Sequence, residues 1–168
     1  MKKIIGLVLL TFSLHSCDDG DITLQSFNFD SQSIQKCSDT NLLFKINDSE
    51  ALLLDIPESS LPTDATPEDT PVELNVSTTN QIIYRKYSGT VTSSSFCGDI
   101  PPASPIVSKE WNASGGKIII ISNYIYDTDN TTIIGLTHNI TFQNVSFSSG
   151  DETFNFETYI FGNYEVDN

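Results

Sequence analysis

The chain has 168 residues, 22 acidic against eight basic side chains, and a formal net charge of −14 at pH 7. This length corresponds to one domain. An acidic balance of this size repels polyphosphates and anionic headgroups, which argues against nucleic acid as a partner and against a basic membrane-binding surface.

The first residues carry the features of a bacterial export signal. "MKK" is followed by an almost wholly apolar run over residues 4–14, too short for a bilayer span of about 20 residues. "LHSC" then resembles a lipobox, with a branched apolar residue at −3, a small one at −1 and Cys17. The resemblance implies that residues 1–16 are a cleaved signal peptide and that Cys17 is acylated and anchors the protein. An ordinary secretory signal and a short uncleaved anchor are the alternatives.

Three acids, Asp18, Asp19 and Asp21, follow the cysteine, and residues 17–21 are interpreted as an acidic tether. They resemble the export signals of surface lipoproteins of Bacteroidota, which implies an outer-membrane location. Whether the protein reaches the cell surface stays open, because a tether that only holds the body off the headgroups has the same composition. Residues 1–16 carry two lysines and no acid, so the other 152 residues carry a net charge of −16.

Residues 22–168 are expected to form a single domain built of β-strands. "NLLFKIN", "EALLLDI" and "PVELNVS" alternate apolar and other side chains, and "QIIYRKYS" is rich in β-branched and aromatic residues. No segment shows a sustained helical period. The pattern predicts an all-β fold, an antiparallel β-sandwich of about nine strands, with a β-barrel as the alternative.

The second half of the chain is read as a meander of strands and turns. "ASGG" (residues 113–116) is expected to be a turn between "PIVSKEWN" and "KIIIISNYIY". "DTDNT" and "SSGDE" are expected to turn the chain on either side of "TIIGLTHNITFQNVSF", and "TFNFETYIFGNY" is the last strand. In the middle strand, Ile134, Leu136, His138, Ile140 and Phe142 fall on one face.

Two long loops interrupt the strands, residues 57–71 and 92–105. Long loops are common places for function, although a plain crossover is the simpler interpretation. With Cys17 assigned to lipid, Cys37 and Cys97 remain as an even pair in an exported protein, which predicts a disulfide. Two buried free thiols are the alternative.

Catalytic signals are weak. Beyond the export signal the chain has a single histidine, His138, which is interpreted as a core or sheet-face residue, and no Gly-x-Ser-x-Gly motif. One histidine and no cysteine cluster disfavour zinc. We therefore expect no enzyme and no cofactor; a small hydrolase using paired acids is the least favoured alternative.

Calcium has one weak candidate. Asp127 and Asp129 take positions 1 and 3 of an EF-like loop, but position 6 is Thr132 and position 12 is His138, where Gly and Glu are required. A looser calcium turn stays open at these residues, and a plain Asx-rich hairpin turn is the simpler interpretation.

"CDDGDITLQSFNFD", Cys37, "LLFKIN" and "FCGDIPPASP" resemble a group of flavobacterial lipoproteins over residues 1–110. The resemblance implies an exported, lipid-anchored protein and supplies no activity. We expect a cell-envelope lipoprotein whose body is a non-catalytic binding or interaction module for an envelope protein or a glycan. A purely structural envelope component is the alternative. Phe96 and Trp111 are candidate contacts, with ordinary packing as the simpler interpretation.

Overall fold

A computed structural model describes residues 27–67 and 70–167 of the chain. The expected signal peptide, Cys17 and the tether 17–21 lie outside the described residues. Within them, the strands are β1 (Gln35–Lys36), β2 (Leu42–Asn47), β3 (Glu50–Asp55), β4 (Val72–Asn75), β5 (Gln81–Tyr87), β6 (Val107–Tyr126), β7 (Ile133–Ser149) and β8 (Glu152–Asp167). Two short helices accompany them, the 3-10 turn η2 (Glu58–Ser60) and α1 (Ser94–Cys97).

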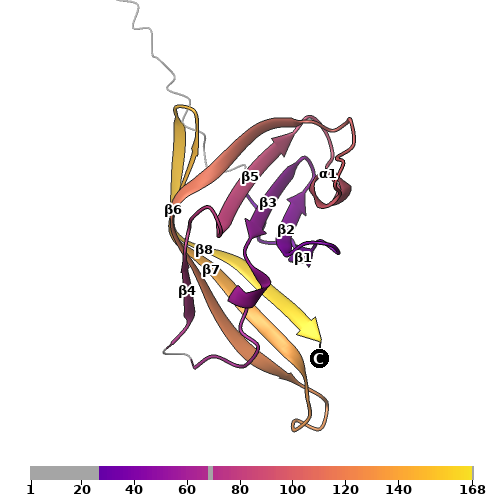
Figure 1. Cartoon of the computed structure of the whole chain (residues 1–168), viewed down its shortest axis with the longest axis vertical. Coiled ribbons are helices and arrows are strands. Elements are labelled where there is room, and N and C mark those ends of the chain that lie inside the picture. Colours follow the sequence, from indigo (N-terminus) through magenta and orange to yellow (C-terminus); the bar gives the residue numbers. More distant parts are fainter. Residues whose placement is uncertain (1–26, 68–69, 168) are drawn as a thin grey trace, which may run out of the picture.

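All strand pairs are antiparallel and belong to one sheet in the order β1-β2-β3-β5-β6-β7-β8, with β4 paired to β6 beside that path. The sheet curls into a half-barrel (Figure 1). The all-β prediction is confirmed. The eight described strands form one continuous curled sheet, whereas the sequence pattern suggested about nine strands in a sandwich.

The predicted turn at "ASGG" is wrong, because β6 runs through these residues. The register of β6 against β7 shifts on both sides of Gly115, so the four residues form bulges inside one 20-residue strand. Gly116 has a φ of 110°, and a Cβ there would lie 2.7 Å from the Val145 Cα on β7. Bulges increase local twist, and this one divides β6 between two partners: its first part pairs with β5 and its later part with β4.

The main core fills the concave side of the sheet. Its buried side chains come from strands across the whole sheet, which is possible only on the inside of the curl. Phe27 and Phe29, at the start of the described chain, insert into this core; Phe27 packs against aromatic rings of β5, β7 and β8. Trp111 is stacked on Tyr84 with ring centroids 5.0 Å apart.

A second, smaller core lies on the convex side under α1. Phe44, Leu53 and Tyr87 belong to it, so β2 and β3 are buried on both faces. The predicted disulfide is present: Cys37 and Cys97 are bonded with their Cα atoms 5.4 Å apart. It ties the 92–105 loop to the start of the sheet.

The other predicted turns are confirmed. β6 and β7 are joined through residues 127–132, and β7 and β8 through Gly150 and Asp151. The loop that follows β3, over residues 57–67, contains η2 and crosses the lower part of the concave face (Figure 1).

Candidate functional site

Three side chains on adjacent strands form a row across the lower concave face. Ser122 of β6 is the register partner of His138 on β7, and His138 is the partner of Tyr164 on β8. The alternation predicted for β7 is confirmed here, since Leu136, His138 and Ile140 are all buried. The next row toward the β6–β7 turn is Tyr124, Leu136 and Val166.

The loop 57–67 forms a wall over these rows because three hydrogen bonds hold it on β6. The Thr66 backbone N–H donates to the Ser122 carbonyl at 2.9 Å, and the Ser122 N–H donates to Thr66 Oγ1 at 2.9 Å. The Tyr124 hydroxyl donates to the Asp64 carboxylate. The loop therefore has a defined position although it has little regular structure.

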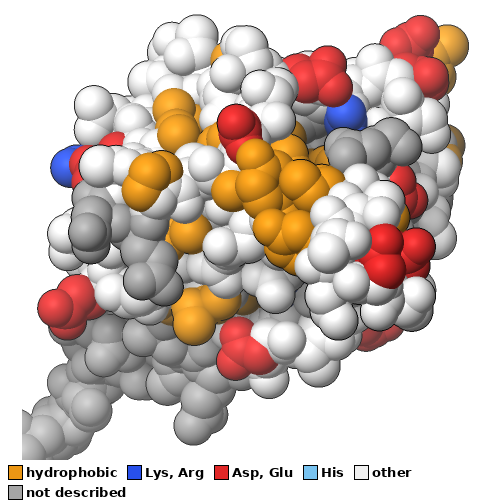
Figure 2. All heavy atoms as spheres, turned by 90° about the horizontal axis from the view of Figure 1, so that it is seen from below, with side chains coloured by type: hydrophobic (Ala, Val, Ile, Leu, Met, Phe, Trp, Pro, Cys, Tyr) orange, Lys and Arg blue, Asp and Glu red, His pale blue; other side chains and the backbone are white. Residues whose placement is uncertain are grey.

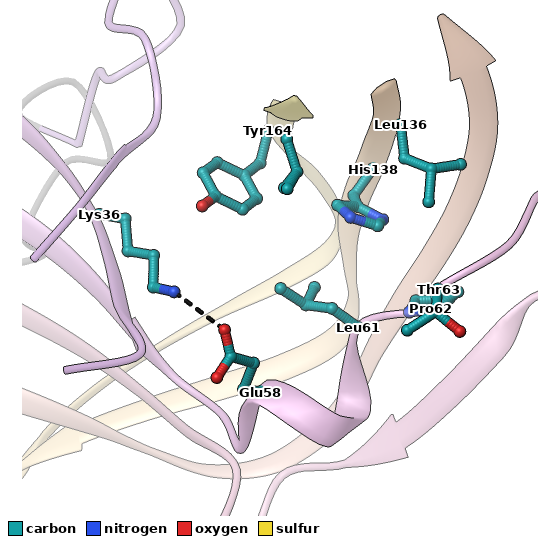
Figure 3. Close-up of a pocket in the computed structure, with 9 residues that line it drawn as sticks. Lys36, Glu58, Leu61, Pro62, Thr63, Leu136, His138 and Tyr164 are labelled. Atoms are coloured by element: carbon teal, nitrogen blue, oxygen red, sulfur yellow. Dashed lines mark hydrogen bonds and ion pairs between the residues drawn. The ribbon is translucent and has the colours of Figure 1, made fainter. Parts of the chain in front are cut away.

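Between the loop and the sheet is a cavity of about 250 Å³ (Figure 3). Its apolar lining comes from both walls: Leu61 and Pro62 from the loop, Leu136 and Val166 from the strands. Its polar lining consists of Thr63, His138, Tyr164 and the ion pair between Lys36 and Glu58, whose charged atoms are 3.3 Å apart. We call this cavity the His138 pocket.

His138 forms part of the inner lining of the pocket and is only 2 % exposed. Its Nδ1 lies 2.7 Å from Ser122 Oγ, and its ring stacks on Tyr164 with centroids 6.1 Å apart. Burial lowers the pKa of His138, so the imidazole is neutral at neutral pH.

The tautomer of His138 follows from the needs of Ser122. A buried hydroxyl needs an acceptor for its hydrogen, and Nδ1 is the acceptor that the described residues supply to Ser122 Oγ. When Ser122 donates to Nδ1, the ring proton is on Nε2. The pocket therefore contains an N–H donor at Nε2 that has no hydrogen-bond partner among the described residues.

The Ser122–His138 pair does not have the geometry of a nucleophile and base. A serine nucleophile must reach a substrate carbonyl, but Ser122 is 0 % exposed and does not line the pocket. The ring nitrogen available to a ligand is Nε2, which is not the nitrogen bonded to Ser122. The hydrogen bond to Ser122 fixes the orientation of the His138 ring and leaves Nε2–H as a donor for a ligand.

The weak calcium candidates lie in the β6–β7 turn. The Asp129 carboxylate accepts hydrogen bonds from the Thr131 and Thr132 N–H groups and from Thr132 Oγ1, and these bonds hold the pKa of Asp129 well below its usual range. Asp127 accepts from the Thr128 N–H. Both carboxylates cap the turn, and no group of three potential metal-ligating side chains occurs in the described ranges.

The two aromatic candidates are packing residues. Trp111 is 1 % exposed in the main core. Phe96 packs edge-on against Phe44 at 4.9 Å in the smaller core. Over residues 27–67 and 70–167, the exposed aromatic side chain is that of Tyr126, which the sequence pattern did not indicate as a contact.

An apolar rim extends from the pocket to the β6–β7 turn. It consists of the exposed side chains of Tyr126, Ile133, Ile134 and Val166. Seen from this end of the molecule, apolar side chains gather near the middle of the face and acidic ones lie around them (Figure 2). The sequence signal for the rim was the phase of β7, which continues apolar from His138 out to Ile134.

No protein-family model, curated protein or solved structure matches this chain. In the part of the chain that the structure covers, no helix has the length and apolar character that a bilayer crossing requires.

Proposed function

We propose that this protein is a lipid-anchored lipoprotein of the bacterial outer membrane and that its β-rich body is a non-catalytic binding module. The lipobox-like "LHSC" supports the anchor. The observation that carries the binding role is the His138 pocket, a mostly apolar cavity with a few convergent polar groups. A purely structural component would not require an oriented donor without a partner in a cavity.

The place of the pocket in the body supports this role. The described chain begins at Phe27, which packs against Phe147 and Phe156 near the β7–β8 turn. Leu136, in the pocket, is eleven positions from Phe147 along β7, about 36 Å at ~3.3 Å per residue. On this proposal, the chain that comes from Cys17 enters the described body at Phe27, near the β7–β8 turn, and the pocket lies toward the β6–β7 turn.

Mass spectrometry of the protein from membranes tests the anchor. We expect a mature chain that begins at an acylated Cys17, and Cys17→Ser is expected to leave the signal uncleaved and unacylated. Ser16→Ala is the matched control, because it keeps a small residue before the cysteine and should be processed normally. An unmodified amino terminus in the native protein would overturn the lipoprotein assignment.

Cross-linking in intact cells and binding to envelope glycans test the role of the pocket. Leu61→Trp fills the pocket from the loop side and should abolish capture of the partner. Ile100→Trp places the same side chain at an exposed site on the 98–105 loop and should preserve it. Equal capture by both variants would show that the pocket is not the binding site.

A further inference from the structure

We infer that the His138 pocket recognises a neutral ligand with an apolar body and one carbonyl oxygen, which accepts a hydrogen bond from His138 Nε2–H. This inference rests on the proposed binding function and names the chemistry of its ligand.

The acceptor requirement comes from the fixed orientation of the ring. Ser122 bonds Nδ1, Tyr164 stacks on the face of the imidazole, and the remaining polar atom, Nε2, carries a proton. Nε2 has no partner among the described residues, and a hydrogen bond formed inside a mostly apolar cavity is stronger than one formed at the open surface. A carbonyl oxygen supplies that acceptor without bringing a charge.

The neutral requirement comes from the charges around the pocket. His138 is neutral, and the ammonium of Lys36 is already paired with Glu58 at 3.3 Å. The pocket thus offers no uncompensated cation to a carboxylate ligand, and the chain's net charge of −14 opposes one. An ammonium ligand would direct its own donors at the Nε2–H donor.

The apolar requirement comes from the two walls. Leu61 and Pro62 face the ligand space from the loop, and Leu136 and Val166 face it from the sheet. Figure 3 shows Leu61 between the ion pair and His138, so an apolar group in the pocket lies beside the donor. A short alkyl chain with a terminal amide has this combination.

Three linear probes of six carbons each separate these requirements: hexanamide, hexanoate and hexylammonium. The full chain, labelled with ¹⁵N at histidine and held in lipid nanodiscs, reports on Nε2–H by NMR. The mature chain expected from Cys17 has a single histidine, His138, and its signal should disappear in His138→Gln. We expect hexanamide to shift this signal saturably and the two charged probes to leave it unchanged at the same concentration.

Three variants test the site on the protein side. Leu61→Trp should abolish the response to hexanamide, whereas Ile100→Trp should retain it. His138→Phe keeps the ring and removes the donor, and it should weaken hexanamide binding about fivefold, as loss of one hydrogen bond predicts. Saturation-transfer NMR observed on the probe measures this affinity.

Each other result overturns the inference. A stronger response to hexanoate would show that the site selects an anion, and an equal response to hexylammonium would show that the donor is not used. No response to hexanamide, together with partner capture that Leu61→Trp abolishes, would reject the ligand class and leave the binding function intact. No response and no partner capture would reject both.

Discussion

At the scale of single residues, the pocket depends on the protonation of His138. The imidazole is buried, and its Nδ1 is hydrogen-bonded to Ser122. Burial lowers the pKa of the ring, so the ring is neutral and Nδ1 can accept the hydrogen bond from the Ser122 hydroxyl. The chain pattern identified His138 as a core or sheet-face residue, and the structure confirms its burial. Its position in a pocket could not be predicted, because the wall over it is held by Thr66, 56 residues away from Ser122 in the chain.

His138 makes the free energy of unfolding depend on pH. Its pKa in the folded protein is below that of the unfolded chain, which is about 6.5. Above that pH, His138 is neutral in both the folded and the unfolded protein, so its full contribution to the free energy of unfolding is present. As the pH falls through about 6.5, the unfolded chain takes up a proton that the folded protein does not, so stability falls by at most about 1.4 kcal/mol per pH unit.

Urea unfolding between about pH 8 and about pH 5, followed by the fluorescence of Trp111, measures this slope. Trp111 is the single tryptophan in the chain. His138→Gln should remove this part of the slope, and Glu58→Gln, which changes a carboxylate facing the same pocket, should retain it. An unchanged slope in His138→Gln would contradict the assignment.

At the scale of elements, local signals predicted strands well and one turn wrongly. "ASGG" has the composition of a turn, yet β6 continues through it because β7 pairs with both of its sides. Composition cannot separate a turn from a bulge; the difference is made by the partner strand, here at Val145. The disulfide was predictable because Cys37 and Cys97 were the two cysteines left after Cys17.

Gly116 and its neighbour provide a matched test of this bulge. Gly116→Ala places a Cβ 2.7 Å from backbone atoms of β7 at a φ of 110°, so we expect a loss of about 2 kcal/mol or more in the free energy of unfolding. Gly115→Ala meets no heavy atom within 4 Å and should change it by less than about 0.5 kcal/mol. Equal effects in urea unfolding would show that the bulge does not require Gly116.

The bond between Cys37 and Cys97 closes a separation of 60 residues. In the chain-entropy model, a loop of this length contributes about 4 kcal/mol. We expect the double variant Cys37→Ala, Cys97→Ala to lose about this amount in urea unfolding, and the denatured wild type to show no free thiol from this pair. Two reactive thiols from Cys37 and Cys97 would contradict the assignment.

At the scale of the whole molecule, the segment that follows the proposed anchor completes the core. No pairing between β8 and β1 or β2 occurs in the described sheet, so its two edges leave the half-barrel open along one side. Residues 27–34 occupy that side. Lys45 Nζ on β2 donates to the Phe29 carbonyl at 3.0 Å, and Ile34 lies against Gly162 of β8. The first described segment, residues 27–34, is therefore a structural part of the sheet's interior.

Phe29 tests how strongly this segment stabilises the half-barrel. Its side chain is 0 % exposed and packs with Phe27 and Tyr84. Removing a buried phenyl ring costs about 3–5 kcal/mol, and the site has little freedom to collapse because rings surround it. Phe29→Ala should lower the free energy of unfolding by about this amount. Phe96→Ala should lower it less, because the Phe96 ring is only half-buried against the smaller core.

Urea unfolding followed through the fluorescence of Trp111 compares the two variants. Equal losses, or a small loss for Phe29→Ala, would mean that the curled sheet is stable without the segment. A large loss would mean that the residues next to the proposed tether are part of the cooperative fold, so that a pull on the anchor acts directly on the core that supports the His138 pocket.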